Sequence, residues 1–409
     1  MSQATCQGCG AALTRSLVDL GRQPLANALV APGTPAPDPA YPLHARVCDR
    51  CRLVQVEPVV PRHALFAADY PYFSSFSESW LAHCDALAGA LTARLGLGPG
   101  SNVVEIGSND GALLSCFRAR GVPAWGVEPS AGVAEAARAR GLRTEIAFFG
   151  EAAARRLAGE GRADLIVATN VLAHVPDIND FLAGVRTLLA PEGLFAVEFP
   201  HLLNLIRETQ FDTIYHEHFT YLSLLALRTA LERNGLALVD AERQPTHGGS
   251  LRVLAGRSGT PSARAVSLIA EEVAAGLDQP SGYAGFAERV ETVRRGLADF
   301  LAAARERGES VAGYGAAAKG NTLLNHVGAS AADIAFVVDR NPAKQGKLLP
   351  GSRIPVHPVS HLLKERPDHV LILPWNLSRE IVGQLPEVAK WGGRFVTAIP
   401  EIRSFSHAD

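Results

Sequence analysis

Short apolar runs recur along the middle of the chain, and most are followed by glycine or polar residues and then by an amphipathic segment. Buried strands that alternate with helical patterns are typical of a parallel sheet covered by helices. A hairpin through Thr246-His-Gly-Gly-Ser250 adds two further strands. The predicted strands are 102–106, 124–128, 143–146, 163–174 with Asn170 at its tip, 193–200, 237–244 and 250–256. The pattern predicts a seven-stranded α/β sheet.

A second series of strands and helices occupies the last third of the chain. Residues 261–307 are mostly amphipathic helix, and residues 310–322 give a strand, a Gly-x-Gly-x-x-Ala turn and a helix. Later strands are expected at 336–339, at Pro355 (a short one), at 369–373 and at 394–397, as in a small doubly wound sheet. We therefore expect three units: residues 1–67, residues 68–258 with the seven-stranded sheet, and residues 259–409 with a Rossmann-like sheet.

Composition narrows the possible partners. The 409 residues carry a formal net charge of −2, so no basic field indicates nucleic acid or an anionic membrane. No run of eighteen apolar residues is present, which argues against a membrane span. The polar first residues are unlike a secretory signal. We expect a cytoplasmic protein, a monomer or homodimer, that acts on a small molecule.

Four cysteines near the start form two Cys-x-x-Cys pairs, Cys6-Gln-Gly-Cys9 and Cys48-Asp-Arg-Cys51. In a reducing compartment such pairs indicate metal rather than disulfides. Two pairs that face each other complete a closed tetrahedral shell of sulfur, which suits Zn²⁺ and leaves no open position for catalysis. The sequence predicts a structural zinc ion here, with free thiols or a redox dithiol as the alternative.

The turn after the first strand of the large sheet points to a cofactor. Glycines at this turn let a ligand approach the backbone, whereas the nearby acids disfavour a pyrophosphate and suit the amino and sulfonium ends of S-adenosylmethionine. Glu128 ends the next strand, 21 residues after Gly107, where a ribose-binding acid is expected. This half is therefore expected to be a class I methyltransferase rather than a hydride-transfer domain. The predicted cofactor residues are Glu105, Gly107, Asn109, Asp110, Gly111, Glu128, Phe148, Phe149 and Asn170.

The stretch from Phe211 to Phe219, Phe-Asp-Thr-Ile-Tyr-His-Glu-His-Phe, holds one phenol, two imidazoles and two carboxylates. On a strand His216 and His218 would share a face and could bind a metal. On a helix Tyr215 and His218 would sit together as an acid/base pair. A solvated polar segment is the third possibility. Since the cysteines already account for a metal, we favour the acid/base cluster.

The Gly-x-Gly-x-x-Ala turn of the last unit carries Lys319 instead of an acid, and Asp339 follows Gly315 by 24 residues. A helix start with a lysine is a good anion site. Three interpretations remain open: an NAD site, a diphosphate site for a nucleotide-linked substrate, or a domain that only packs. Trp375 and Asn376 come directly after a later strand and are expected near the same cleft.

Taken together, these motifs resemble those of the zinc-containing C-methyltransferases that act on nucleotide-linked 4-keto deoxysugars. The resemblance covers nearly all of the chain. It is carried by the two Cys-x-x-Cys pairs, Tyr70-Pro-Tyr72, Glu-Ile-Gly-x-Asn-Asp-Gly, Phe-Asp-x-Ile-Tyr-x-Glu-His-Phe, His247-Gly-Gly, Gly-Tyr-Gly-Ala-x-Ala-Lys and Asp339-x-x-Pro-x-Lys-Gln345.

The resemblance implies a substrate, expected to be dTDP-linked, between the last two domains, with the C-terminal domain holding the nucleotide-sugar rather than NAD. It implies His218 as general base, with Tyr215, Glu217 and Tyr72 around the sugar. Two positions depart from the family pattern, His216 and Phe73, and His216 is expected to tune substrate choice. The candidate substrate residues are Tyr70, Ser74, His201, His216, His247, Gly315, Lys319, Asn321, Asp339, Trp375 and Asn376.

The mechanism expected from these residues is removal of the proton beside a ketone by His218, after which the enolate carbon attacks the sulfonium methyl group. A free imidazole is too weak a base for this proton, so Tyr215 or Tyr72 must stabilise the developing oxyanion. The alternatives are methylation of oxygen or nitrogen, an additional NAD-dependent oxidoreductase activity, and a binding module without activity.

Overall fold

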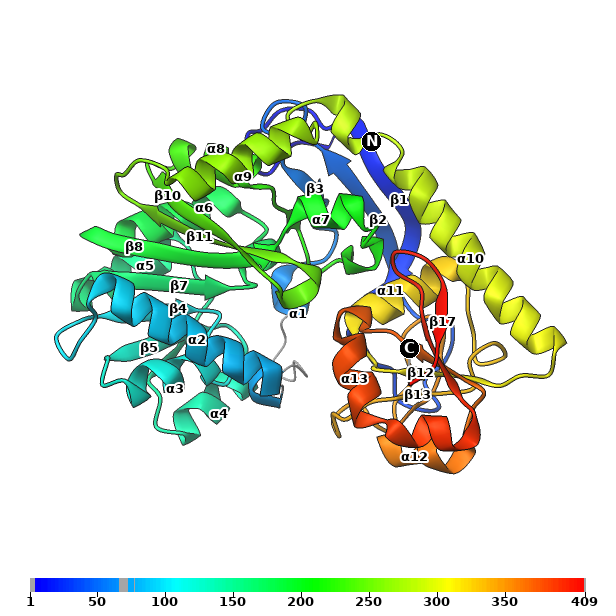
Figure 1. Ribbon diagram of the computed structural model, residues 1–409. Coiled ribbons are helices and arrows are strands. Elements are labelled where there is room, and N and C mark those ends of the chain that lie inside the picture. Colours follow the sequence, from blue (N-terminus) through cyan, green and yellow to red (C-terminus); the bar gives the residue numbers. More distant parts are fainter. Residues whose placement is uncertain (1–3, 66–72, 77, 408–409) are drawn as a thin grey trace.

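The computed structural model describes residues 4–65, 73–76 and 78–407. Tyr70 and Tyr72, both expected at the substrate site, lie outside these described residues. Figure 1 shows the N-terminal strands and the long helix α10 along the upper and right sides. The central part of the chain, with the large sheet, lies at the left and the C-terminal part at the lower right. In the described part of the chain, no helix combines the length and the apolar character that a membrane span requires.

The N-terminal domain is a small antiparallel sheet, and its last strand comes from the centre of the chain. The strand order is β1-β2-β3-β9. The elements are β1 (Arg15–Pro24), β2 (Ala40–Val47), β3 (Val54–Val56), the short helix α1 (Arg62–Leu65) and β9 (Thr220–Tyr221). Because β9 directly follows the stretch 211–219, the N-terminal domain holds one end of that stretch.

The central domain is the predicted seven-stranded α/β sheet, in the order β10-β11-β8-β7-β4-β5-β6 with β11 antiparallel to both neighbours. Its strands are β4 (Val103–Ile106), β5 (Ala124–Glu128), β6 (Thr144–Ile146), β7 (Ala163–Thr169), β8 (Leu189–Pro200), β10 (Ala237–Gln244) and β11 (Ser250–Gly256). Its helices are α2 (Glu78–Leu95), α3 (Ala112–Ala119), α4 (Ala131–Ala139), α5 (Glu151–Leu157), α6 (Ile178–Leu188), α7 (Leu202–Arg207), α8 (Leu224–Arg233) and α9 (Ala263–Ala274).

Apolar runs form the inner strands because both faces of the sheet are covered. Along β4, Val103 packs with α2 and α3, whereas Val104 packs on the opposite side with α5 and α6. Side chains alternate across a strand, so burial of both faces requires apolar residues at every position. Helix α9 packs on β10 and shares this core through Ala265 and Leu268. Residues 263–274 therefore lie with the central sheet, although they were expected in the C-terminal unit.

The C-terminal domain is a six-stranded sheet in the order β14-β13-β12-β15-β16-β17, parallel except for β17. Its strands are β12 (Val311–Tyr314), β13 (Val337–Val338), β14 (Val356–His357), β15 (His369–Ile372), β16 (Arg394–Thr397) and β17 (Arg403–Phe405). Its helices are α10 (Phe286–Glu306), α11 (Ala318–Val327), α12 (Val359–Glu365) and α13 (Ser378–Gln384). The α/β fold class with flanking domains is confirmed.

One apolar core joins the N-terminal and C-terminal domains. Helix α10 packs on β1 and on α11. Leu17 and Leu43 of the N-terminal sheet belong to the same buried cluster as Leu297 and Leu301 of α10. The N-terminal domain thus contacts both Rossmann-like halves and fixes how they face each other.

Candidate active site

A cavity of about 420 Å³ lies where the three domains meet. The carboxyl ends of β4, β5 and β7 form one end, and the stretch 213–222 forms the opposite wall. Asn27 and Arg62 enter from the N-terminal domain, whereas Lys319 and Lys344 enter from the C-terminal domain. Ligands of open α/β sheets bind beyond the carboxyl ends of the strands, so the cavity lies where the fold predicts a ligand.

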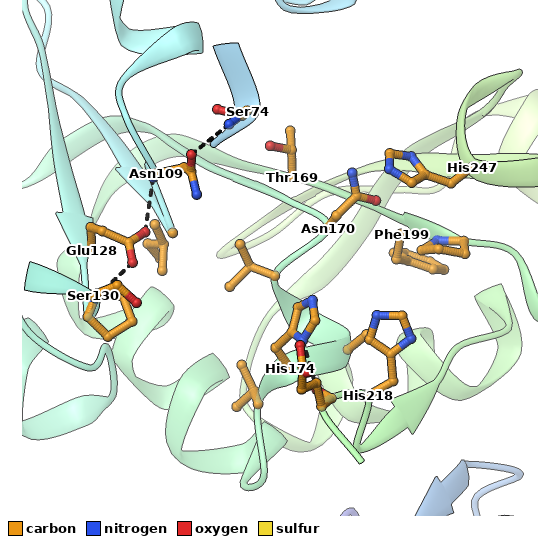
Figure 2. Close-up of a pocket in the computed structure, with 18 of the residues that line it drawn as sticks. Ser74, Asn109, Glu128, Ser130, Thr169, Asn170, His174, Phe199, His218 and His247 are labelled. Carbon is orange, nitrogen blue, oxygen red and sulfur yellow. Dashed lines mark hydrogen bonds between the residues drawn. The ribbon is translucent and has the colours of Figure 1, made fainter. Parts of the chain in front are cut away.

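Glu128 anchors the cofactor end of the cavity. Its carboxylate accepts hydrogen bonds from the backbone N–H groups of Asn109 at 3.0 Å and Ser130 at 2.9 Å, as Figure 2 shows. Burial raises the pKa of Glu128, and burial together with Glu128 and Asp110 raises the pKa of Glu105 well above its usual value. Glu105 Oε2 has no hydrogen-bond partner among the described residues.

Unsatisfied buried oxygens of this kind fit a ligand that donates hydrogen bonds or carries positive charge. The hydroxyls of Ser108 and Ser130 are likewise buried without a described partner. These oxygens can accept hydrogen bonds from the ribose hydroxyls and the ammonium group of S-adenosylmethionine. A pyrophosphate, in contrast, would be repelled by the two carboxylates at this turn. This end of the cavity fits the expected cofactor.

Two glycines shape the turn beside Glu128. Gly107 has φ +67°, and a Cβ on it would lie 2.4 Å from Val171 Cγ2. Gly111 has φ +82°, and its Cβ would lie 2.2 Å from Leu142 Cδ1. A side chain at either position would both clash and strain the backbone. The cofactor turn therefore requires glycine at both positions.

Most of the predicted cofactor residues line the cavity, but two of them support it from behind. Asp110 and Gly111 do not face the cavity. Asp110 instead accepts hydrogen bonds from the hydroxyls of Ser74, at 2.8 Å, and Ser75. The residues that do line the cavity are Glu105, Gly107, Asn109, Glu128, Phe148, Phe149 and Asn170.

The two phenylalanines after β6 have different environments. The guanidinium group of Arg62 lies 4.5 Å from the ring centre of Phe148, a cation–π arrangement. Phe149 is buried edge-on against Phe181, with 5.3 Å between ring centres. Phe148 thus offers the more accessible face to an adenine ring.

The stretch 211–219 is neither a helix nor a strand. It begins with the 3₁₀ turn η4 (Phe211–Thr213) and continues through a second turn, in which His218 N donates to Tyr215 O at 2.9 Å, into β9. This turn brings together Tyr215 and His218, the pair expected of an acid/base cluster. Their rings lie 4.0 Å apart, and the Tyr215 hydroxyl is 2.8 Å from His218 Nε2.

Hydrogen bonding defines the tautomer of His218. Its Nδ1 lies 2.9 Å from the carbonyl oxygen of Thr213, which can only accept, so Nδ1 carries the proton and Nε2 the lone pair. Burial and the neighbouring His174 lower the pKa of His218 well below its usual value. His218 is therefore a neutral imidazole with its lone pair turned toward Tyr215.

His174 is a cavity residue that the sequence analysis missed. Its Nδ1 lies 2.7 Å from the carbonyl oxygen of Glu217. Its ring meets that of His218 edge-on, with 4.7 Å between the ring centres, and Figure 2 shows the two histidines side by side. Burial lowers the pKa of His174 to about 4. It lies in the 3₁₀ turn η3 (Leu172–His174) just past β7, and its position after a strand end is the only signal that the sequence offered.

Two histidines predicted at the substrate site do not reach the cavity. His216 points away from it, because its Nε2 lies 3.2 Å from the carbonyl oxygen of Pro42 and its ring packs edge-on against Tyr41. His201 is buried, and its Nε2 lies 2.6 Å from Glu272, which also accepts from the N-terminus of α8. The geometry gives both histidines packing roles, so neither is carried forward as a substrate contact.

Lys319 forms the C-terminal wall of the cavity. Its Nζ donates to Asn376 Oδ1 at 2.6 Å and lies 4.9 Å above the ring of Trp375. Burial lowers the pKa of Lys319, whereas nearby Asp212 raises it. His247, in the turn η5 (Thr246–Gly248), faces the same space, and burial lowers its pKa to about 4. Trp375 and Asn376 thus support Lys319 from behind rather than line the cavity.

The other residues predicted at the C-terminal fingerprint are also supporting residues. Asp339 accepts from the backbone N–H groups of Ala316 and Asn341, both at 2.7 Å. Gly315 has φ +89° and packs on Pro374, and Asn321 is buried within the domain. Lys344, which was not singled out by itself, lines the cavity and donates to Ala316 O at 2.7 Å.

The four N-terminal cysteines converge on one point. Their Sγ atoms all lie within 4.8 Å of one another, with 3.5 Å between Cys6 and Cys51 and between Cys9 and Cys48. Tetrahedral zinc–thiolate bonds place sulfurs about 3.8 Å apart, so the cluster fits Zn²⁺. The amide of Gln55 donates to Cys6 Sγ at 3.2 Å. Within residues 4–65, 73–76 and 78–407, no other group of three or more His, Cys, Asp or Glu side chains converges in this way.

Comparison with protein families matches three consecutive segments. Residues 6–66 match a family described as "Putative zinc binding domain", residues 80–241 a "Methyltransferase domain", and residues 245–400 a "C-methyltransferase C-terminal domain". The three matches follow the three structural domains in order.

Curated relatives extend the match to the whole chain. The C-methyltransferase NovU of Streptomyces niveus is 39% identical over 409 residues, covering 98% of this chain and 96% of the relative. A ubiquinone biosynthesis O-methyltransferase of Rhodopseudomonas palustris is 27% identical over 99 residues, covering 24% of this chain and 39% of the relative.

Solved structures align with less than half of the chain. Magnesium protoporphyrin IX methyltransferase from Synechocystis PCC 6803, with bound SAH, is 18% identical with a TM-score of 0.36, covering 44% of this chain and 83% of that chain. The CcbJ methyltransferase from Streptomyces caelestis is 18% identical with a TM-score of 0.35, covering 43% and 91%.

The match to NovU runs from end to end, and the cavity and the cysteine cluster fit the cofactors that such an enzyme requires. The chain therefore belongs to the C-methyltransferase family and is an S-adenosylmethionine-dependent methyltransferase with a zinc-binding N-terminal domain.

Proposed function

We propose that the protein methylates the carbon next to the ketone of a nucleotide-linked 4-keto deoxysugar, through an enolate, with His218 as the general base. The observation that carries the proposal is the Tyr215–His218 pair: a phenol 2.8 Å from the lone pair of a neutral imidazole, in the cavity that also contains the cofactor turn. S-adenosylmethionine supplies an electrophilic methyl group when bound.

His218 removes the proton with the lone pair of Nε2, which the Tyr215 hydroxyl contacts when no substrate is bound. The carbonyl oxygen of Thr213 holds Nδ1–H, so Nε2 accepts the proton and Thr213 stabilises the imidazolium that forms. Because burial lowers the pKa of His218, the imidazole is unprotonated at neutral pH. A weak base needs an acidified substrate, so stabilisation of the enolate oxygen must supply much of the rate.

Tyr215 is placed to stabilise that oxygen. In the absence of substrate its hydroxyl donates to His218 Nε2. A ketone oxygen that takes over this hydrogen bond frees the lone pair and places the base beside the neighbouring carbon. The same exchange therefore activates the base and polarises the ketone.

The cations of the C-terminal wall suit the nucleotide part of the substrate. Lys319 and Lys344 line the cavity beside the N-terminus of α11, whose residues Ala317 and Ala318 also face it. A helix N-terminus with flanking ammonium groups attracts phosphate. We assign the diphosphate of the substrate, which is expected to be dTDP-linked, to this wall, because the cofactor turn at the other end presents acids.

The test is incubation with S-adenosylmethionine and a panel of nucleotide-linked 4-keto deoxysugars in D₂O, followed by mass spectrometry and NMR of the product. We expect a new carbon–methyl bond, and deuterium at the same carbon when the cofactor is replaced by S-adenosylhomocysteine. His218→Asn should abolish both, whereas His361→Asn on the C-terminal domain should change neither. A methyl group on oxygen or nitrogen, or full activity of His218→Asn, contradicts the proposal.

A further inference from the structure

Asn27, a residue of the N-terminal domain, reaches the active site. It lies three residues past β1 and lines the cavity. Its side-chain Nδ2 is 2.8 Å from both carboxylate oxygens of Glu217, so one amide group spans the two oxygens. Glu217 itself is only 3% exposed. A buried carboxylate accepts hydrogen bonds and cannot donate them, so a donor at position 27 is well matched to it.

The backbone of Glu217 is held as firmly as its side chain. Its carbonyl oxygen accepts from His174 Nδ1 at 2.7 Å, and the next residue but one, Phe219, donates its N–H to Ala173 O at 2.7 Å. With the main chain fixed from the side of the central domain, the direction of the carboxylate depends on the groups that contact it. Asn27 makes one such contact, through its side-chain amide.

The N-terminal domain is itself attached to this stretch, which fixes the position of Asn27. Strand β3 pairs with β9, so that Val54 lies opposite Tyr221. The N–H of Val56 donates to Phe219 O at 3.0 Å, and Pro42 O contacts His216. The N-terminal domain is therefore hydrogen-bonded to His216 and Phe219, on either side of Glu217.

We propose that Asn27 is a positioning residue of the active site, contributed by the N-terminal domain, which keeps the Glu217 carboxylate directed into the substrate cavity. The inference rests on the proposed function in one respect, because it assigns Glu217 a contact with the sugar. Position 27 then affects the rate through Glu217 and does not touch the reacting atoms.

The variant that isolates this role is Asn27→Asp, which keeps the shape of the side chain but replaces both amide N–H donors by an acceptor. We expect kcat with the keto-sugar to fall about ten- to hundred-fold, as for loss of a hydrogen bond to a buried charge. The KM for S-adenosylmethionine should stay within about two-fold, because the cofactor turn is untouched.

The matched control is Asn179→Ala. Asn179 Nδ2 also joins the N-terminal and central domains, by donating to the carbonyl oxygens of Gln7 and Gly8 at 3.2 Å, but it does not line the cavity. If Asn27 merely docked the two domains, both variants would lose activity alike. We expect the kcat of Asn179→Ala to remain near that of the wild type.

A double-mutant cycle with Glu217→Gln completes the test. In the double variant the amide introduced at position 217 can donate to the carboxylate introduced at position 27, so the contact returns with its polarity reversed. Asn27→Asp should then lower kcat less than about two-fold further in the Glu217→Gln background. The unfolding midpoint in urea should drop in Asn27→Asp and recover in the double variant.

Two outcomes overturn the inference. One is a wild-type kcat in Asn27→Asp. The other is a double variant whose loss of kcat equals the product of the two single losses and whose unfolding midpoint in urea does not recover. The urea cycle needs no substrate and therefore separates the two proposals. If the wild type methylates no nucleotide-linked keto-sugar, the proposed function fails, and additive unfolding effects would reject the Asn27–Glu217 pairing independently.

Discussion

The indole Nε1 of Trp375 donates a hydrogen bond of 2.7 Å to Asp212 Oδ2. This contact crosses from the C-terminal domain to the first turn of the stretch 211–219. The indole ring packs tightly against Gly248, since a Cβ at that position would lie 2.6 Å from the Trp375 ring. The ring also lies under Lys319. Trp375 thus connects Lys319, on the C-terminal wall of the cavity, with the segment that carries Tyr215 and His218.

Trp375→Phe should weaken this connection without removing the aromatic ring. The indole donor is lost, and Asp212, which is fully buried, loses the hydrogen bond that Trp375 gives it. We expect the free energy of unfolding to fall by about 1 to 3 kcal/mol. We also expect a higher KM for the nucleotide-linked substrate, because Lys319 loses its support. Urea unfolding and steady-state kinetics check the two effects, and a KM unchanged from that of the wild type would show that Lys319 is held by Asn376 alone.

The buried carboxyl group of Asp212 is expected to make the stability of the protein depend on pH. Burial raises its pKa from 3.8 to about 6, although the facing Lys319 and the Trp375 hydrogen bond lower it. The folded protein therefore binds this proton more tightly than the unfolded chain, and the contribution of Asp212 to stability decreases as pH rises from about 4 to about 6.

Asp212→Asn removes this titration but keeps an oxygen that can accept from Trp375. Relative to the wild type, the variant should gain stability by about 2 kcal/mol as the pH is raised from about 4 to about 7. Urea unfolding of both proteins across this range gives the difference curve. A difference that stays flat with pH would mean that Asp212 titrates normally.

The zinc site should be required for catalysis because its domain pairs with β9. Cys48→Ser removes one thiolate of the four-sulfur shell, and we expect loss of the metal and a drop in kcat on the order of ten-fold or more. Cys116→Ser, outside the cluster, should keep both metal and activity. Elemental analysis of the purified proteins together with rate assays decides the matter; a metal-free Cys48→Ser protein with wild-type kcat would make the N-terminal domain dispensable for catalysis.

Gly107→Ala should damage cofactor binding selectively. The added Cβ would lie 2.4 Å from Val171 at a φ of +67°, so the turn must shift. We expect weaker binding of S-adenosylhomocysteine by about 1 to 3 kcal/mol, measured by titration calorimetry. Gly98→Ala is the control, since nothing lies within 4 Å of a Cβ at that position. Equal affinities of the two variants would mean that the turn tolerates a side chain.

The features that could be predicted from the sequence are those that depend on residues close together along the chain. The seven strands followed from apolar runs, because burial of both faces of a parallel sheet leaves that pattern. The cysteine cluster followed from two pairs of ligands, each closed within a single turn. Glu128 could be assigned because a strand end fixes its location relative to Gly107 in any fold of this class.

The remaining features depend on contacts between distant segments. Asn27 and Glu217 are 190 residues apart, and no local pattern marks either as a partner of the other. The side chains of His201 and His216 turn toward Glu272 and Pro42, and no local pattern in the sequence indicates these partners. The stretch 211–219 was expected as a helix or a strand, yet its conformation is imposed by pairing with the N-terminal domain at one end and by Trp375 at the other.

The pairing of β9 with β3 also has a consequence for the order of assembly. Val54 and Tyr221 are far apart in sequence, and contacts of long separation form late because closing a long loop costs conformational entropy. The central sheet can gather its own strands before that contact exists. A chain caught at that stage would possess the cofactor-binding sheet while residues 211–219 still lacked a fixed position, so the complete cavity forms only after the N-terminal domain has paired with β9.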